Sequence, residues 1–305
     1  MLAAFLTTIL FATSAICGYR VSKQIGGVEA NFWRITLATI FLTVWAFSWG
    51  AGFEGAPVWF MISGLFGIGL GDSAYFQALP RLGSRRVVLM TQCLTAPFAA
   101  LAEFFWLGTI LNLAEILCIV VILAGVGIAL KPDDHVKISA RDWKIGIVAC
   151  VFSAIGAAIG AVIIRKAYQV AQQDGFHPDA GTTGYQRVLG GIIVPTIMLL
   201  LFKWRSAHAH GPVFSSDTLH ITRTKWRRIW PWVLANALAG QTLGVTCMQW
   251  ALQTTQAGIV TAIIATTPIF LLPMTRVIEK EKIYAHSVIG AVIAVLGVIG
   301  LTFLR

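Results

Sequence analysis

The sequence predicts an all-α membrane protein in which ten transmembrane helices form a five-plus-five inverted repeat. Three observations support this prediction. Hydrophobic residues make up 57% of the 305-residue chain and charged residues only 12%, whereas soluble domains are roughly 45–50% apolar and about 25% charged. Apolar runs that are long enough to cross a bilayer recur along the whole chain, and the second half repeats features of the first.

Each predicted span holds about 20 mostly apolar residues, the length that a helix needs to cross about 30 Å of hydrocarbon. A β-barrel would instead need segments of about 10 residues that alternate apolar and polar side chains, and the run at 114–130 does not alternate. The first span lacks the basic segment of a secretory signal, so we expect it to be a transmembrane helix. The predicted spans are residues 2–22, 30–49, 57–79, 87–107, 112–130, 145–167, 183–203, 230–252, 257–277 and 284–304.

The two halves carry the same residue types at matched places when Ala78-Leu79 is aligned with Ala251-Leu252. Five helices per half is an odd number, so the second copy would enter the membrane from the opposite side, as inverted repeats do. We expect residues 1–131 and 145–305 to be the two repeats and residues 132–144 to be the loop between them. The matched pairs are Gly67 and Gly240, Gly71 and Gly244, Pro97 and Pro268, Gly125 and Gly297, and Arg34 and Arg187.

Several short motifs occur in a fixed order in this repeat. The third span ends in Tyr-Phe-x-Ala-Leu at 75–79, Thr-x-Pro occurs at 95–97 and 266–268, and spans five and ten end in glycine-rich apolar runs. Over essentially the whole chain, this order resembles the drug/metabolite transporter superfamily, specifically its EamA-type members. The resemblance implies a secondary transporter that works by alternating access and exports amino acids, related metabolites or drugs.

One acidic residue lies within an apolar run. Asp72 is the fifteenth or sixteenth residue of the third span, and an acid near the centre of a membrane helix costs about 2.5–3.5 kcal/mol to insert, so it normally faces a cavity or a partner. Tyr75 and Phe76 share its helical face. A carboxylate beside aromatic rings could bind an ammonium group, although a structural hydrogen bond to another helix is the alternative. Asp72 aligns with Val245, so the fold does not require an acid there.

Other polar side chains are expected to line the same central cavity, formed by spans three, four, eight and nine with help from one and six. Gln241 and Gln249 share one face of span eight and could lie across the cavity from the acid. Gln92, Thr95 and Thr266 are close to the prolines of spans four and nine, which free backbone carbonyls or act only as hinges. The predicted substrate-binding residues are Asp72, Tyr75, Phe76, Gln92, Thr95, Gln241, Gln249 and Thr266.

Basic residues gather on one side of the predicted helices. Nineteen Lys and Arg belong to the turns after odd-numbered spans and four to the other side, and the positive-inside rule then places both termini outside. The family resemblance implies the reverse orientation, and we follow the charge count. Arg34 and Arg187, each about one turn into a helix, are expected to extend to the interface or to face a vestibule and attract anions.

No motif indicates an enzyme, because HExxH, GxSxG and His/Cys clusters are all missing from the sequence. We therefore expect no cofactor and no metal, while coupling to a proton or to sodium stays open. The net charge of +10, placed at span ends, favours anionic lipid near the basic loops rather than nucleic acid.

We predict a monomer or weak homo-oligomer in a plasma membrane or bacterial inner membrane that carries a small-molecule substrate. The substrate is expected to be a polar or amphiphilic solute with an amine, such as an amino acid. The alternatives are an antiporter of anionic metabolites such as phosphorylated sugars, or a structural or sensory membrane protein.

Overall fold

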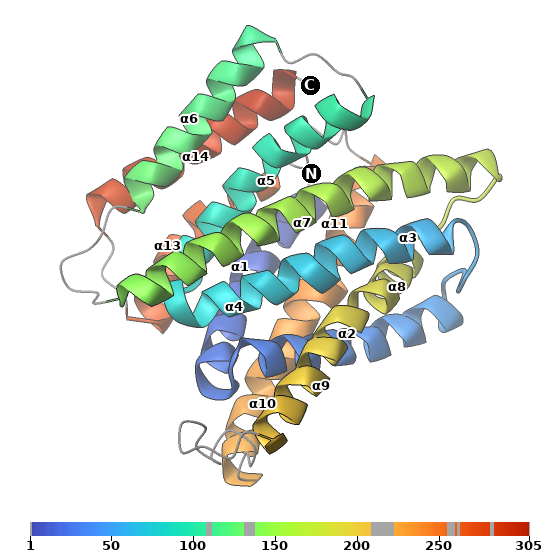
Figure 1. Ribbon diagram of the computed structural model, residues 1–305. Helices are drawn as coiled ribbons and strands as arrows, with labels where there is room; N and C mark the ends of the chain where they lie inside the picture. The colour runs from blue at the N-terminus through green and yellow to red at the C-terminus, as the bar shows by residue number, and fades with distance from the viewer. Residues whose placement is uncertain are drawn as a thin grey trace.

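The computed structural model describes residues 2–107, 112–130, 138–208, 223–254, 260, 263–280 and 284–304, and these ranges are helical without any strand (Figure 1). The helices are α1 (Leu2–Ile25), α2 (Gly27–Ser48), α3 (Pro57–Gly64), η1 (Leu65–Gly71), α4 (Asp72–Leu82), α5 (Ser84–Leu107), α6 (Leu113–Ala129), α7 (Ala140–Gln173), α8 (Ala180–Gly191), α9 (Ile193–His208), α10 (Arg223–Ala237), η3 (Leu238–Thr242), α11 (Leu243–Thr254), α13 (Thr267–Ile278) and α14 (Ala285–Leu304).

Every predicted span overlaps at least one of these helices, which confirms the all-α prediction. Five helical segments in the described ranges are long and apolar enough to cross a membrane by length and composition, and α6 and α13 are shorter apolar helices. Ten crossings therefore stays a prediction. The five segments are Leu2–Ile25, Gly27–Ser48, Ala140–Gln173, Ala180–Arg205 and Ala285–Leu304.

The start of α7 lies earlier in the chain than the start of the predicted span 145–167. Helix α7 begins at Ala140, inside the predicted loop 132–144, because the Ser139 side chain accepts a hydrogen bond from the Asp142 backbone amide and caps the helix there. Residues 132–137 of that loop, and residues 209–222 between α9 and α10, lie outside the described ranges.

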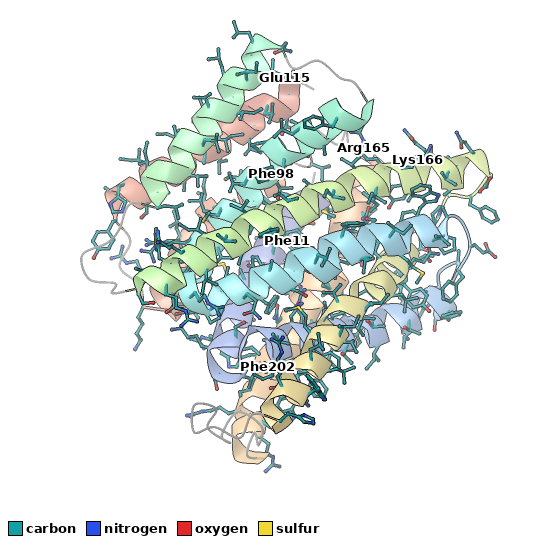
Figure 2. All side chains as sticks on the ribbon, in the orientation of Figure 1. Phe11, Phe98, Glu115, Arg165, Lys166 and Phe202 are labelled. Carbon is teal, nitrogen blue, oxygen red and sulfur yellow. The ribbon has the colours of Figure 1, made fainter. Side chains whose placement is uncertain are left out.

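Helices α6 and α14 form a close pair at one side of the protein (Figure 1). A Cβ atom on Gly125 would lie 2.4 Å from the Ala294 backbone nitrogen, so only glycine allows the two backbones to approach this closely. Figure 2 shows Glu115 at the start of α6, where it forms a capping box with Asn112. Large exposed side chains on the pair are apolar, as lipid contact requires: Leu117, Val120, Leu123, Ile289, Val292 and Leu296.

The third helical unit of each half packs against the first helix of the other half. The run α3, η1 and α4 lies along α7, as Figure 1 shows, and the run α10, η3 and α11 lies along α1. Hydrogen bonds join both pairs at aligned positions: Ser63 donates to the Gly160 carbonyl at 2.7 Å, and Ser14 donates to the Asn236 side chain at 2.7 Å. The two halves therefore form one interior.

Both third units contain a π-helical segment at the same place in the repeat. When the halves are aligned on their Ala-Leu pairs, η1 (Leu65–Gly71) coincides with 238–244, and η3 is Leu238–Thr242. The wider π turn leaves backbone groups less regularly bonded and is common at functional sites. Asp72 follows η1 directly, and Gln241 lies within η3, so each π-helical segment adjoins or contains a predicted site residue.

Candidate functional site

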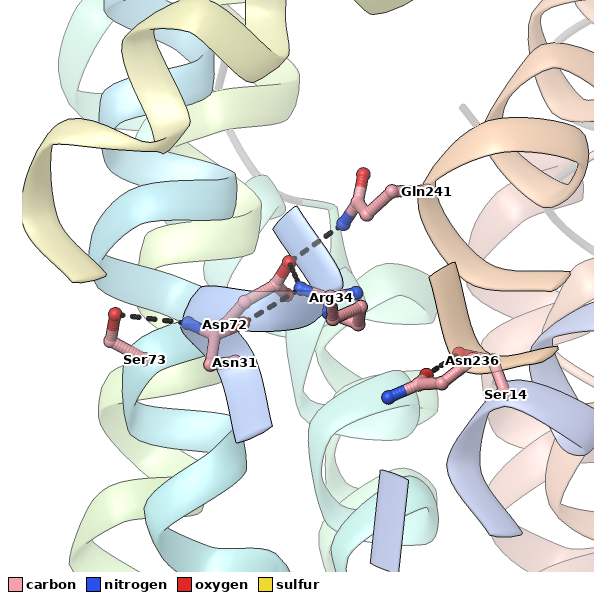
Figure 3. Close-up of polar contacts among 7 residues, drawn as sticks. All are labelled: Ser14, Asn31, Arg34, Asp72, Ser73, Asn236 and Gln241. Atoms are coloured by element: carbon pink, nitrogen blue, oxygen red, sulfur yellow. Dashed lines mark hydrogen bonds and ion pairs between the residues drawn. The ribbon is translucent and has the colours of Figure 1, made fainter. Parts of the chain in front are cut away.

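An ion pair lies in the protein interior between α2 and α4. The Arg34 Nη2 atom is 2.6 Å from Asp72 Oδ2, and the side chains are 5% and 25% exposed. From the other half, the Gln241 Nε2 atom donates a hydrogen bond of 2.7 Å to the same oxygen (Figure 3). Asp72 therefore links the two halves of the protein, and hydrogen bonds to a charged acceptor are stronger than neutral ones.

The surroundings of Arg34 hold its guanidinium group in place. Asn31, one turn earlier on α2, accepts a hydrogen bond of 3.0 Å from Nη2, and its own amide donates to the Ser73 hydroxyl at 3.3 Å (Figure 3). The guanidinium also lies over the Phe76 ring, 4.8 Å from its centroid. The acid and aromatic ring on one helical face thus do bind a cation, as the sequence pattern suggests, but in this structure that cation is Arg34.

One oxygen of the Asp72 carboxylate is left open. Both of the hydrogen bonds described above end on Oδ2, and none of the described residues donates to Oδ1. With a quarter of its side chain exposed, Asp72 can accept a further donor without releasing Arg34 or Gln241. The carboxylate is consequently both a structural link and an accessible acceptor.

A second polar cluster surrounds Arg187 on α8. The Tyr168 hydroxyl of α7 lies 2.8 Å from Gln249 Oε1 and 3.2 Å from Thr183 Oγ1, and Arg187 interacts electrostatically with Tyr168 and with Asp72. Arg187 is 9% exposed and Gln249 is 1% exposed. The Arg187 Nε and Gln249 Nε2 atoms have no hydrogen-bond partner in the described part of the chain. Such unpaired buried donors are costly in an apolar interior.

The predicted site residues divide between these places. Asp72, Phe76 and Gln241 lie together, Tyr75 packs beside Phe76 with ring centroids 5.6 Å apart, and Gln249 belongs to the second cluster. Their role in binding a substrate stays a prediction.

In the part of the chain that the structure describes, the remaining predicted residues make no hydrogen bond or ion pair with either cluster. Thr95 and Thr266 each donate a 2.6 Å hydrogen bond to a backbone carbonyl of their own segment, Thr91 and Ile263. Gln92 lies on α5 and is partly buried. These three positions are therefore structurally separate from the Asp72 contacts described here.

The two arginines are the residues whose position the sequence predicted least well. Both side chains are buried in the protein, Arg34 on α2 and Arg187 on α8, rather than extended along its surface. The useful signal was their matched position in the repeat: a Cβ atom on Gly240 would lie 3.5 Å from Arg34 Nη1, and one on the aligned Gly67 would lie 3.6 Å from Arg187 Nη2. The guanidinium groups occupy equivalent places in the two halves.

Contacts between the halves also occur at both ends of the helices. At the end where α4 turns into α5, Ser84 donates to the Glu279 carboxylate at 2.9 Å. At the opposite end, Gln186 Nε2 donates to the backbone carbonyls of Gly52 and Glu54 at 3.0 and 2.9 Å. The polar interior therefore lies between two layers of contacts that join the halves.

The profile of the EamA-like transporter family matches residues 1–131 and 144–303. A solved protein crystal structure is similar in fold, with a TM-score of 0.58 and 17% sequence identity over 99% of this chain and 96% of the other. No curated protein matches the sequence. The family match covers nearly the whole chain in two segments, in agreement with the repeated helical units described above.

Proposed function

The chain belongs to the EamA-like transporter family and is a multi-pass membrane transporter, and we propose that it moves a small polar or amphiphilic metabolite with an amine, such as an amino acid, by alternating access. Export is the direction we propose, from the resemblance drawn above. The observation that carries the proposal is Asp72, a membrane-interior acid that contacts both halves and keeps one carboxylate oxygen open.

The arrangement of the halves supports alternating access. The third helical unit of each half packs against the first helix of the other half, and the π-helical segments η1 and η3 lie at the same place in both repeats. We propose that the repeats are inverted in the membrane, so that the same contacts can open toward one side and then toward the other. The cross-half hydrogen bonds of Ser84 and Gln186 would then break in alternation.

The amine is assigned to Asp72 because ammonium groups require acceptors, and a charged acceptor in a low-dielectric interior binds them strongly. The Oδ1 atom is the acceptor to which none of the described residues donates. Tyr75, which is partly exposed and packs against Phe76, supplies apolar ring surface one turn along α4 from the acid for the body of the solute.

The proposal is tested by uptake of a labelled amino-acid mixture into proteoliposomes. We expect Asp72→Asn to abolish uptake, whereas Asp142→Asn, which removes an acid that is 51% exposed, should leave it unchanged. Because Asp72→Asn leaves the Arg34 charge buried without a counter-charge, the double variant Arg34→Gln/Asp72→Asn is the folded control. Undiminished uptake by a monodisperse double variant would rule out the role of the acid.

A further inference from the structure

We propose that Arg187 is the binding site for the carboxylate end of the transported solute. This inference rests on the proposed function and names the second half of the ligand: a monocarboxylate that carries an amine at a short distance. It follows from a difference between two positions that the repeat makes equivalent.

The two arginines lie at equivalent places in the two halves. Arg34 lies beside Gly240 and Arg187 beside Gly67, two glycines that occupy the same place in the repeat. Arg34 pairs with Asp72 at 2.6 Å. At the position equivalent to Asp72 the second half has Val245, which is 7% exposed and has no charge.

Arg187 lies in an environment where the described residues supply no counter-charge for it. Its side chain is buried, its Nε has no hydrogen-bond partner, and in the ranges that the structure describes no carboxylate lies within ion-pair distance of it. Asp72 interacts with it electrostatically, but that single negative charge already neutralises Arg34. An uncompensated charge is expensive in this setting, so the site favours a ligand that brings the missing anion.

The charges and hydrogen-bond donors of the site indicate the charge and shape of the ligand. Arg34 and Asp72 neutralise each other, which leaves the single positive charge of Arg187, and one carboxylate compensates that charge more closely than a doubly charged phosphate ester does. A guanidinium group presents planar paired donors that suit a carboxylate. Gln249 Nε2, buried and unpaired beside Tyr168, is a further donor in the same cluster. The ligand's amine would meet Asp72, which directly follows η1, the segment that contains Gly67 beside the Arg187 guanidinium.

The experiment measures the thermal midpoint of the purified full-length protein in detergent with matched acid and amide probes. The probes are acetate, propionate, L-leucine and L-phenylalanine, each compared with its amide. We expect at least one acid to stabilise the protein at a concentration at least about tenfold lower than its amide does. In Arg187→Gln this difference should disappear. The proposal is overturned if no acid exceeds its amide, or if Arg187→Gln keeps the difference.

A second pair of variants leaves Arg187 in place, in case Arg187→Gln does not fold. Val245→Asp supplies the second half with the acid that the first half has, so the internal carboxylate should occupy Arg187, raise the thermal midpoint and remove the response to acids. Val245→Asn has the same size without the charge and should keep that response. If both variants respond like the wild type, or both lose the response, the charge of Arg187 is not what binds the ligand.

These measurements do not depend on transport, so the two proposals fail separately. An acid preference that requires Arg187, in a protein that transports none of the amino acids, would contradict the proposed function but support the proposed binding site. Amino-acid uptake that requires Asp72 but not Arg187 would contradict the proposed binding site but support the proposed function.

Discussion

Arg34 in the first half and Arg187 in the second occupy equivalent places in the repeat but have different partners. Arg34 has a carboxylate at 2.6 Å, an amide from Asn31 and the ring of Phe76. In the described part of the chain Arg187 has no carboxylate within ion-pair distance, and the residue aligned with Asp72 is Val245. Of these two arginines in equivalent places, the protein therefore pairs one with an internal carboxylate and leaves the other without one.

Within one chain, a comparison of aligned positions in the two repeats distinguishes residues with a structural role from residues with a functional role. Gly67 and Gly240 are the same in both halves and each allows an arginine to approach, which indicates a structural role. Asp72 and Val245 differ, and the difference changes the charge of the interior. The four predictions below test the comparison, beginning with the largest expected effect.

Replacement of Arg34 by Gln should be the most destabilising change. It leaves the Asp72 carboxylate in the interior without its counter-charge, and breaking a buried ion pair from one side costs about 3–5 kcal/mol; the 25% exposure of Asp72 places the cost at the lower end of that range. Arg187→Gln should cost less, because no paired acid is left behind. Thermal midpoints of the two variants in one detergent check the order, and a greater loss for Arg187→Gln would contradict it.

Gly64→Ala should destabilise the contact between α3 of the first half and α8 of the second without changing a charge. A Cβ atom there would lie 1.7 Å from the Arg187 carbonyl oxygen, so α3 and α8 must separate, and overpacking of this kind costs about 1–3 kcal/mol or more. The aligned residue in the second half is Ala237. Gly127→Ala is the control, because nothing lies within 4 Å of its added Cβ. Equal thermal midpoints for the two variants would show that α3 and α8 are not packed this closely.

Gln241→Leu should have a smaller effect, about 1.5 kcal/mol, because it removes a hydrogen bond to a charged acceptor that keeps its bond from Arg34. Gln249→Leu is the matched change in the same helical run. It removes the neutral acceptor of the Tyr168 hydroxyl, which stays 3.2 Å from Thr183 Oγ1, and an amide nitrogen that has no partner among the described residues, so it should cost less than Gln241→Leu. Thermal unfolding of both variants tests this order, which fails if Gln249→Leu is the more destabilising.

The smallest effect concerns Asp179, which caps α8 ahead of its first residue. Burial would raise the pKa of Asp179, but hydrogen bonds from Thr182, from Trp45 and from the backbone amides of 181 and 182 outweigh it and hold the pKa below its ordinary value. A lowered folded-state pKa stabilises the protein above the unfolded-state pKa, near about 4. The stabilisation relative to Asp179→Asn should therefore be full at neutral pH and decline below about pH 4. A difference in thermal midpoint that does not change with pH would contradict this.

The fold was largely predictable because its causes are visible along the chain. Apolar runs of membrane length and the aligned glycines predicted the all-α, two-repeat architecture, which the family match supports. The π-helical segments could not be predicted, since glycines such as Gly67 and Gly71 permit a wider turn without requiring it.

The site was predicted in part. Helical spacing and the repeat placed Gln241 opposite Asp72, and the two side chains do meet at 2.7 Å. The same reasoning did not pair Asp72 with Arg34, because an ion pair between residues 38 apart depends on how α2 packs against α4, and no local spacing encodes that packing. Arg34 was therefore expected near an interface rather than as the acid's partner.

The most direct test of the central claim is amino-acid uptake into proteoliposomes that contain Val245→Asp or Val245→Asn, because these variants differ only in whether Arg187 receives an internal carboxylate. We predict uptake within about twofold of wild type for Val245→Asn and a loss of at least about tenfold for Val245→Asp, the factor that corresponds to about 1.4 kcal/mol. Equal uptake by the two variants would contradict the claim that the free charge of the second half binds the solute.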